Sequence, residues 1–302
     1  MKYPHLTAML YAELWAIEAW KLEELRGVLE FYSNADPRDM AALEAKLPKT
    51  IERETASKRG KVGLLPIRGT IANRFNMMSS VSGGSSAEVL SRDFSAMMRD
   101  DDIKAVVLDV DSPGGTVAGT DELSAQIAGA RGVKPIVAHV NGRAASAAYW
   151  IATAADEVVM SPSAMAGSIG ILTAHDDLSK AMESRGVKTT LIHAGKYKVE
   201  GNPFGPLSDE AREHIQASVD KAHGHFINRV ASNRHVSKKT VAEDFGQGRM
   251  FDADTSVSLG MADQIATLEQ TLNRFGATSH QPVAQARAFP FEREKRALAF
   301  NT

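Results

Sequence analysis

Short, almost entirely apolar segments alternate with longer helical ones through the middle of this 302-residue chain. Uninterrupted apolar runs are typical of strands that are covered on both faces of a sheet. Their alternation with helices favours an α/β fold with mostly parallel strands. The expected strands are Val62–Ile67, Ala105–Val110, Pro135–Val140, Glu157–Met160 and Thr189–Ile192, and the expected helices are Ser86–Met98, Thr120–Ala130, Ala145–Ala155, Asp176–Arg185 and Ser208–Asn233.

The two ends of the chain differ from this central part. Residues 6–32 are predicted to form one amphipathic helix, because apolar residues recur three and four positions apart between acids and lysines. A shorter helix over residues 37–47 and a charged linker follow. After residue 276 no apolar face is sustained, which indicates a flexible tail. We therefore divide the chain into an N-terminal helical extension with its linker (1–60), a main domain (61–276) and a C-terminal tail (277–302).

Composition excludes several classes of function. The net charge of −2 gives no basic field for nucleic acid. The absence of cysteine excludes disulfides, thiol nucleophiles and cysteine-ligated zinc, and the nine histidines show no metal-ligand spacing. Charged residues interrupt the apolar part of residues 6–32, so it is predicted to be neither a membrane span nor a secretory signal. We therefore expect a cytoplasmic protein with no nucleic-acid or membrane partner.

Ser146 is the first candidate for chemistry. It lies in the run Ala144-Ala145-Ser146-Ala147-Ala148, where a strand is expected to give way to a helix. Backbone N–H groups at a helix start are unpaired. The N–H of Ala147 can therefore hold an oxyanion formed when Ser146 attacks a carbonyl. The alternative is a closely packed helix in which serine is a small filler, and the run is not the Gly-x-Ser-x-Gly elbow of the α/β-hydrolases.

A pair of glycines supplies a second candidate. Gly114 and Gly115 follow Ser112-Pro113 directly after an expected strand. Glycine allows a ligand to approach the backbone closely, and the proline stiffens the turn before it. These N–H groups can complete an oxyanion hole, where one donor is worth roughly 2.7–4 kcal/mol in the transition state. An ordinary strand-to-helix turn would have the same sequence.

A lysine in a third segment is a candidate general base. Lys198 ends the run Gly195-Lys196-Tyr197-Lys198 in a polar loop. A lysine amine is a poor base at neutral pH unless burial lowers its pKa. Lys196 is an equally good candidate by composition, and either could be a solvated surface charge. Ser168, in Gly167-Ser168-Ile169-Gly170, offers a second hydroxyl that can orient the amine.

Taken together, these segments make the chain resemble the S49 peptidases, a family that includes signal peptide peptidase A and the head maturation proteases of tailed phages. The resemblance runs from about residue 61 to 268. It is carried by the motifs already named and by Pro203-Phe204, Gly248-Arg-Met-Phe251 and Leu259-Gly-Met-Ala-Asp263. The family implies a ClpP/crotonase-like fold of repeated ββα units, here with an N-terminal helical extension.

The resemblance also implies the roles of single residues. Ser146 matches the nucleophile of the family, Lys198 its general base and Ser168 the serine that contacts the lysine. Gly114 or Gly115 and Ala147 match the backbone donors of the oxyanion hole. The chemistry implied is peptide hydrolysis by a Ser/Lys dyad with no metal or cofactor. Where the family usually has Ser-Gly-Gly, this chain has Ser146-Ala147-Ala148.

Within the family, the phage branch fits better than the membrane-anchored bacterial form. The resemblance then implies capsid, portal or scaffold proteins as substrates, the host cytoplasm or the procapsid as the location, and a homo-oligomer. The substrate is expected to add as an extended strand along residues 80–86 or 114–117. Three fates of the tail stay open: a natural end, self-processing, and continuation into a scaffold region.

Alternatives from other classes stay open. A signal peptide peptidase-like protease without a membrane anchor is the nearest. A ClpP-like Ser-His-Asp triad could use His175, which follows Ser146 by 29 residues and precedes Asp176 and Asp177. A crotonase-type acyl-CoA enzyme shares the fold but needs no lysine at position 198. A structural or binding role would leave the site idle.

Overall fold

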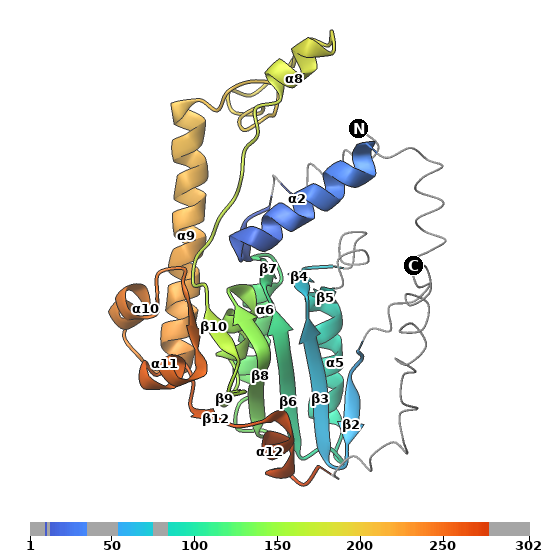
Figure 1. Cartoon of the computed structure of the whole chain (residues 1–302), viewed down its shortest axis with the longest axis vertical. Coiled ribbons are helices and arrows are strands. Elements are labelled where there is room, and N and C mark those ends of the chain that lie inside the picture. The colour runs from blue at the N-terminus through green and yellow to red at the C-terminus, as the bar shows by residue number, and fades with distance from the viewer. Residues whose placement is uncertain (1–9, 11–12, 35–53, 75–83, 278–302) are drawn as a thin grey trace, which may run out of the picture.

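The computed structural model describes residues 10, 13–34, 54–74 and 84–277. Its body is a mixed α/β fold with a mainly parallel central sheet, which confirms the predicted class (Figure 1). The central parallel strands are β3 (Val62–Arg68), β6 (Ala105–Ser112) and β8 (Ile136–Ala145). They cover the predicted strand residues except Pro135, and they are almost wholly buried because helices or neighbouring segments lie on both faces.

The strand β8 divides the edge of this sheet in two. Its first half pairs in parallel with β9 (Glu157–Met160), and its second half pairs in parallel with β10 (Met165–Gly167). The remaining strands close the two edges: β2 (Ser57–Arg59) is antiparallel to β3, β11 (Met250–Asp252) is antiparallel to β10, and β12 (Gln264–Ile265) is parallel to β9. The split places the end of β8 beside the end of β10.

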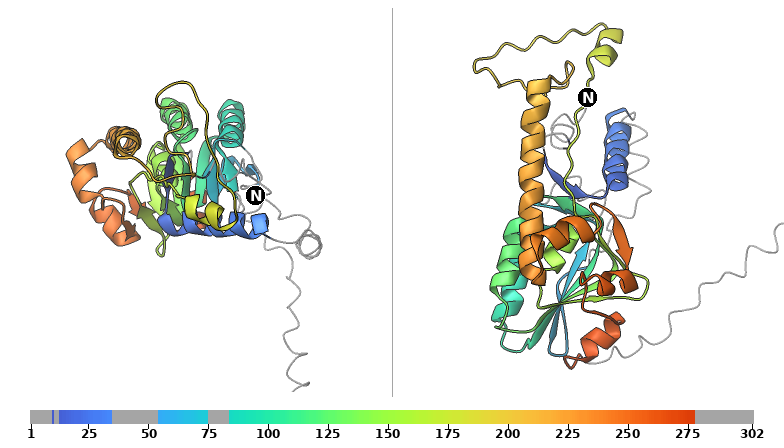
Figure 2. Two further views of the ribbon diagram at one scale, coloured as in Figure 1. Left: turned by 90° about the horizontal axis from the view of Figure 1, so that it is seen from above. Right: turned by 90° about the vertical axis from the view of Figure 1, so that its left-hand side faces the viewer.

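A second, smaller sheet lies at the carboxyl end of the central strands. Its order is β1 (Trp15–Ile17), β7 (Gly114–Thr116), β4 (Thr70–Ala72) and β5 (Gly84–Ser86). Together with α5 (Ala87–Arg99) and α6 (Thr120–Gly129), the strands make ββα units, in which β6, β7 and α6 are one example. Both helices pack on the same face of the central sheet (Figures 1 and 2).

The remaining helices frame the sheet. Helix α7 (Ala147–Ala152) is buried at every residue, whereas α9 (Asp209–Arg234) buries mainly its C-terminal half. The other helices are α2 (Ala19–Asn34), α8 (Ser179–Ser184), α10 (Lys238–Asp244), α11 (Ala253–Ser258) and α12 (Leu268–Asn273). The segment from α8 to the first turns of α9 projects away from the body, and we call residues 176–212 the arm (Figure 2).

One of the predicted strands, over residues 189–192, is absent from the arm. Residues 189–192 form no strand, and Ile192 is 97% exposed. An apolar run becomes a strand only where a neighbouring strand completes its hydrogen bonds, and none is present within the described part of the arm. The helix predicted over 176–185 is shorter, since α8 covers only Ser179–Ser184.

The N-terminal prediction is wrong in one respect. Residues 15–17 form the strand β1, and the helix begins only at Ala19, so residues 6–32 are not one helix. Pairing with β7 stabilises the extended conformation of this apolar segment. The helix predicted over residues 37–47 lies outside the described residues, as does the tail beyond Ala277. Across the described ranges no helix is long and apolar enough to cross a bilayer.

Candidate active site

Ser146 lies at the sharp turn between β8 and α7. Its φ of 53° is on the left-handed side, which is uncommon for a residue with a side chain. The amide of Ser146 donates to the carbonyl oxygen of Gly167 at 2.8 Å, and its hydroxyl donates to the carbonyl oxygen of Gly170 at 3.3 Å. Non-glycine residues in such conformations are concentrated at functional sites. The serine is fully buried, so a substrate can reach it only after something moves.

The helix that follows Ser146 is held firmly in the core. The amide of Trp150 donates to the carbonyl oxygen of Ser146 at 2.9 Å, which closes the first turn of α7. The Tyr149 hydroxyl donates to the carbonyl oxygen of Met261 at 2.9 Å, and burial raises the pKa of this phenol well above its ordinary value. The phenol therefore serves as a neutral hydrogen-bond donor, and the alanines beside Ser146 allow the close packing.

The glycine pair lies directly beside the serine turn. Gly114 has a φ of 100°, and a Cβ added there would be 2.2 Å from the carbonyl oxygen of Ala16 and 3.0 Å from that of Ala145. Only glycine fits both this conformation and this space. The Gly114 amide already donates to the Ser112 hydroxyl at 3.1 Å. Gly115 pairs with Ala16 of β1 and with Ile71 of β4, so both glycines already lie among backbone partners.

Ser168 is brought to the same place. It follows Gly167, which pairs with Ala145 across β10 and β8. Like Ser146 it has a left-handed backbone, with φ of 55°, and its amide donates to the carbonyl oxygen of Arg249 at 2.7 Å. Two left-handed serines thus lie at the ends of neighbouring strands.

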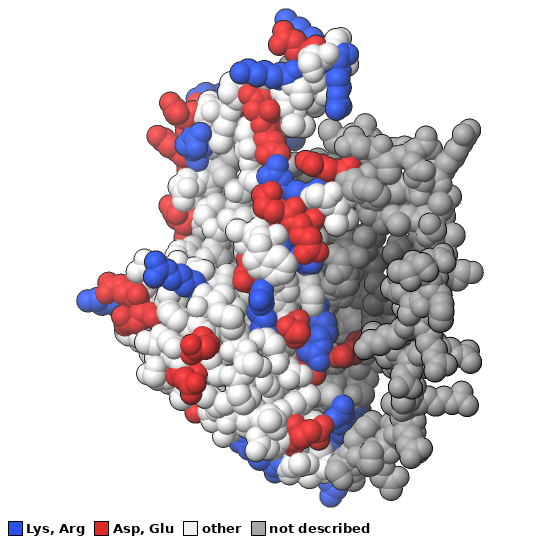
Figure 3. All heavy atoms as spheres, viewed as in Figure 1, with Lys and Arg blue, Asp and Glu red and all other residues white. Residues whose placement is uncertain are grey.

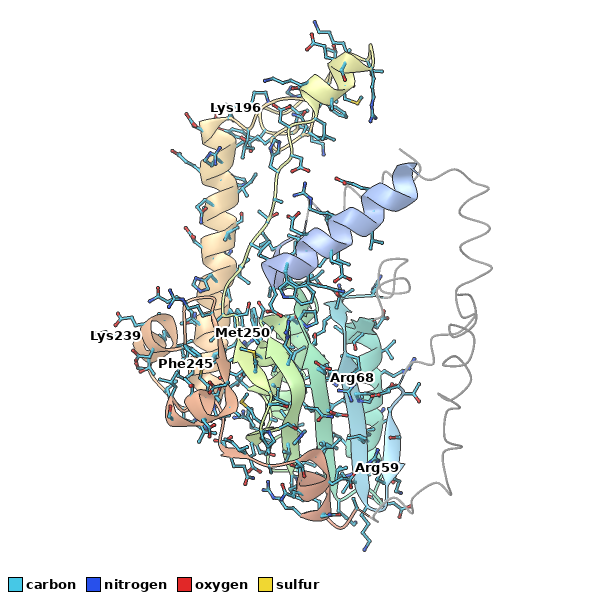
Figure 4. All side chains as sticks on the ribbon, in the orientation of Figure 1. Arg59, Arg68, Lys196, Lys239, Phe245 and Met250 are labelled. Atoms are coloured by element: carbon cyan, nitrogen blue, oxygen red, sulfur yellow. The ribbon has the colours of Figure 1, made fainter. Side chains whose placement is uncertain are left out.

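Lys198 is not brought to this site within one copy of the chain. It lies in the turn of residues 195–201, it is exposed, and none of the described hydrogen bonds or ion pairs joins it to Ser146. Its neighbour Lys196 lies beside the first turn of α9, where its amine binds Glu210 at 2.8 Å (Figure 4). The hydrogen bond to Glu210 raises the pKa of Lys196 above its usual value, which keeps this amine protonated at neutral pH.

His175 is likewise apart from Ser146. Its Nε2 atom lies 3.0 Å from the carbonyl oxygen of Asn202, at the base of the arm. Within the described residues the ring makes no hydrogen bond to either candidate serine. The geometry of one copy therefore unites Ser146, Ala147, Ser168 and the glycine pair, and leaves both Lys198 and His175 outside.

Comparison with known proteins identifies the family. The sequence model of peptidase family S49 matches residues 129–281, which are half of the chain and include Ser146, Ser168 and Lys198. The chain belongs to peptidase family S49. Capsid assembly protease C of Escherichia phage lambda is 30% identical over 204 residues, covering 68% of this chain and 46% of the relative. Head-tail preconnector protein GP5 of Enterobacteria phage P21 is 30% identical over 212 residues, covering 70% of this chain and 42% of the relative.

A relative from a cellular organism and a solved structure are also similar. Putative protease MJ0651 of Methanocaldococcus jannaschii is 32% identical over 176 residues, covering 58% of this chain and 56% of the relative. The chain thus spans about half the length of these relatives. Among solved structures, a mutant ClpP1 from Listeria monocytogenes has 13% identity and a TM-score of 0.44, covering 69% of this chain and 94% of that one.

Two features of this S49 site escaped the sequence analysis. One is the Ser112 hydroxyl, which accepts from Gly114 and itself donates to the carbonyl oxygen of Gly69 at 2.6 Å. The other is β1, which lies against both glycines. The four consecutive apolar residues Leu14-Trp15-Ala16-Ile17 were the available signal, because an amphipathic helix would interrupt such a run.

Proposed function

We propose that this chain is a serine endopeptidase in which Ser146 is the nucleophile and Lys198 is the general base. The observation that carries the proposal is the left-handed turn at Ser146, next to a helix start and to a glycine pair that no side chain could replace. A strained strand-to-helix turn presents the nucleophile in other serine hydrolases as well. Membership in peptidase family S49 supports the assignment of the reaction.

The reaction follows from the groups at this turn. The Ser146 hydroxyl loses its proton to the Lys198 amine, and its oxygen bonds to the carbonyl carbon of the substrate. The N–H groups of Ala147 and of Gly114 or Gly115 stabilise the negative oxygen that forms. The protonated lysine then gives the proton to the leaving amine as the C–N bond breaks. Water, deprotonated by the same lysine, releases the acyl group from Ser146 and restores the serine.

Lys198 reaches Ser146 in this proposal through the arm. Either the arm folds down onto its own body or it brings the lysine to a second copy. The arm exposes large apolar side chains, among them Ile192, Tyr197 and Leu191. Such a surface is typical of an interface. We favour the second copy, because the first half of α9 packs on little of its own chain and holds the arm away from Ser146 (Figures 1 and 2). This accords with the homo-oligomer that we expect.

The proposed substrates are polypeptides of virus assembly. A relative from phage lambda is named a capsid assembly protease, and another from phage P21 is named a head-tail preconnector protein. By this similarity we propose that the chain cleaves capsid, portal or scaffold proteins in the cytoplasm of the host. On the face drawn in Figure 3, acidic and basic side chains are interspersed, which suits binding through the substrate backbone better than charge steering.

The base is tested with single variants. Lys198→Ala should lower cleavage of a casein or peptide substrate by about 10²–10⁴-fold, the usual contribution of a general base. Ser146→Ala, which removes the nucleophile, should lower it by roughly 10⁶-fold. Lys196→Ala, two residues away on the same turn, is the matched control and should keep its activity. A fluorophosphonate probe reports separately on whether Ser146 is reactive. Activity that survives Lys198→Ala but not His175→Ala would replace the dyad with a Ser-His triad.

Mixing two inactive variants tests whether Lys198 acts on Ser146 of its own copy or of a neighbouring copy. If Lys198 serves a neighbouring copy, Ser146→Ala protein mixed and reassembled with Lys198→Ala protein regains part of the activity, because some sites receive both groups. If the lysine serves its own copy, the mixture stays inactive. Light scattering on the wild type gives the size of the assembly, and a monomer would contradict the proposed second copy.

A further inference from the structure

The strand β1 lies between two backbone edges beside Ser146. On one side, the Val117 amide donates to the carbonyl oxygen of Leu14 at 2.9 Å, and the Glu18 amide donates to that of Pro113 at 3.0 Å. On the other side, Trp15 and Leu172 exchange two backbone hydrogen bonds of 2.9 Å each. The five residues from Leu14 to Glu18 therefore form a middle strand. Without them, two unpaired edges would face each other across an open groove.

One peptide bond of this strand lies directly against Gly114. A Cβ built on Gly114 would be 2.2 Å from the carbonyl oxygen of Ala16 and 3.0 Å from the Cα of Ile17. These two atoms belong to the peptide unit that joins Ala16 to Ile17. The carbonyl oxygen of Ala145, the residue before Ser146, lies 3.0 Å from the same point. The unit thus lies against the glycine pair, next to the turn that carries the serine.

The side chains of the strand alternate between two environments. Ala16 is fully buried in the main core, whereas Trp15 and Ile17 belong to a separate apolar cluster with Leu22, Leu25 and Leu29 of α2. The position that faces the body is therefore small, and the positions that face α2 are large. Helix α2 crosses above β7 and β4 and covers the strand from outside (Figure 1).

Ion pairs connect β1 and α2 to the body of the protein. Glu18 binds Arg143 of β8 at 2.7 Å, three residues before Ser146, and Arg26 of α2 binds Asp176 at 2.8 Å at the start of the arm. The exposed Trp20 lies over the Arg143 guanidinium, with 5.4 Å between the charge centre and the ring centroid. These contacts hold β1 and α2 against β8 and against the start of the arm.

We propose that residues 14–18 occupy the substrate groove of their own chain, with the Ala16–Ile17 peptide in the position of the reacting bond. Strand addition through the backbone is a common way to bind an extended polypeptide, and the two edges here are already used in that way. The preferred substrate is then an extended segment with a small residue before the reacting bond and large apolar neighbours. Any other substrate must displace β1, which also explains why Ser146 is fully buried.

The proposal rests on the proposed function, and a matched pair of substitutions tests it. Ala16→Arg puts a long charged side chain where the structure has no space, so β1 should leave the groove. Ala19→Arg makes the same chemical change at an exposed residue of α2 and should leave β1 in place. Because the apparent rate scales with the fraction of open molecules, we expect fluorophosphonate labelling of Ser146 about tenfold faster or more in Ala16→Arg only.

A second readout does not depend on catalysis. In hydrogen exchange, the amides of Val117 and Leu172 should lose protection in Ala16→Arg and keep it in Ala19→Arg. A synthetic peptide with the sequence of residues 13–20 should restore that protection and slow the labelling again. The same peptide with arginine in place of the first of its two alanines should do neither.

The outcomes separate this inference from the proposed function. Equal labelling and equal protection in folded Ala16→Arg and wild type would overturn the occupied groove and leave the peptidase assignment intact. Absence of labelling in every variant, with protection lost and restored as stated, would overturn the peptidase assignment alone. If Ala16→Arg does not fold, Glu18→Lys replaces it. Like charge against Arg143 should then give a smaller shift in the same direction, with Glu30→Lys as its control.

Discussion

The indole of Trp150 and the ring of Phe226 are stacked with their centroids 4.5 Å apart and an angle of 11° between their planes. The contact joins the helix behind Ser146 to the long helix that carries the arm. Both rings are fully buried in the main core. The C-terminal half of α9 is therefore fixed next to α7, the helix that follows Ser146. Any movement of the arm must take place about this fixed part of α9.

Phe226→Ala should lower the free energy of unfolding by about 3–5 kcal/mol, because it leaves a cavity against Trp150. Urea denaturation followed by circular dichroism measures the change. Phe204→Ala, at a partly exposed phenylalanine of the arm, is the control and should cost much less. A small effect of Phe226→Ala would mean that α9 is not anchored by this stack.

Gly115→Ala should destabilise the fold by about 1–3 kcal/mol or more, since an added methyl group would be forced against backbone. A Cβ at this position would lie only 1.8 Å from the carbonyl oxygen of Ile71. Gly129→Ala, in a helix with free space around the glycine, should instead stabilise by roughly 0.5–1 kcal/mol. Thermal unfolding compares the two variants, and a Gly115→Ala protein as stable as wild type would exclude the close approach.

Acid should destabilise the protein through His139. Burial lowers the pKa of this imidazole to about 4, with a further lowering by Arg68 and an opposing influence of Asp109. In the unfolded chain the same group takes up a proton near pH 6.5. Between these two values the unfolded state binds more protons, so stability falls as the pH falls, by about 3 kcal/mol at most from this residue.

His139→Gln should flatten that dependence. Glutamine keeps polar atoms for Thr271 and Ser161, which lie 3.0 Å from the two ring nitrogens, but it does not titrate. Urea midpoints at pH 7 and pH 4.5 should therefore differ less in His139→Gln than in the wild type. His214→Gln, at an exposed histidine of α9, should leave the difference unchanged.

Arg131→Lys should be costly although the charge is kept. The guanidinium donates to the carbonyl oxygens of Thr153, Ala154 and Ala155 at 2.7–2.9 Å, beyond the end of α7. Burial lowers the pKa of Arg131, and a lysine amine cannot satisfy all of these acceptors. We expect a loss of about 1–3 kcal/mol in urea denaturation. Arg229→Lys, in the exposed pair with Asp121, should change stability by less than about 1 kcal/mol.

The sequence predicted the parts of the fold whose environment is local or uniformly buried. The strands from Val62, Ala105 and Glu157 begin where expected, because both of their faces are covered and the apolar run is therefore unbroken. Helix α9 was predicted to within one residue at either end, since Ser208 caps it and the chain turns left-handed at His235. Ser146 and Ser168, both named as candidates from their motifs, follow neighbouring strands that pair at Ala145 and Gly167.

The failures all concern partners distant along the chain. Residues 189–192 have the composition of a strand, but the arm offers them no neighbour. Residues 15–17 fit a helical stripe, yet pairing with β7 decides their conformation. The contact of Lys198 with Ser146 stays a prediction, because spacing along a chain does not say which copy of the chain completes the site.

The left-handed backbone of Ser146 sets stability against reactivity at a single position. Glycine adopts that conformation freely, whereas any other residue there costs about 1–3 kcal/mol. The sequence that folds best and the sequence that reacts are therefore different at residue 146. In a descendant that is no longer selected for catalysis, we expect Ser146 to be replaced by glycine before other site residues change. Glycine at this position would therefore indicate a relative that has lost its enzymatic activity.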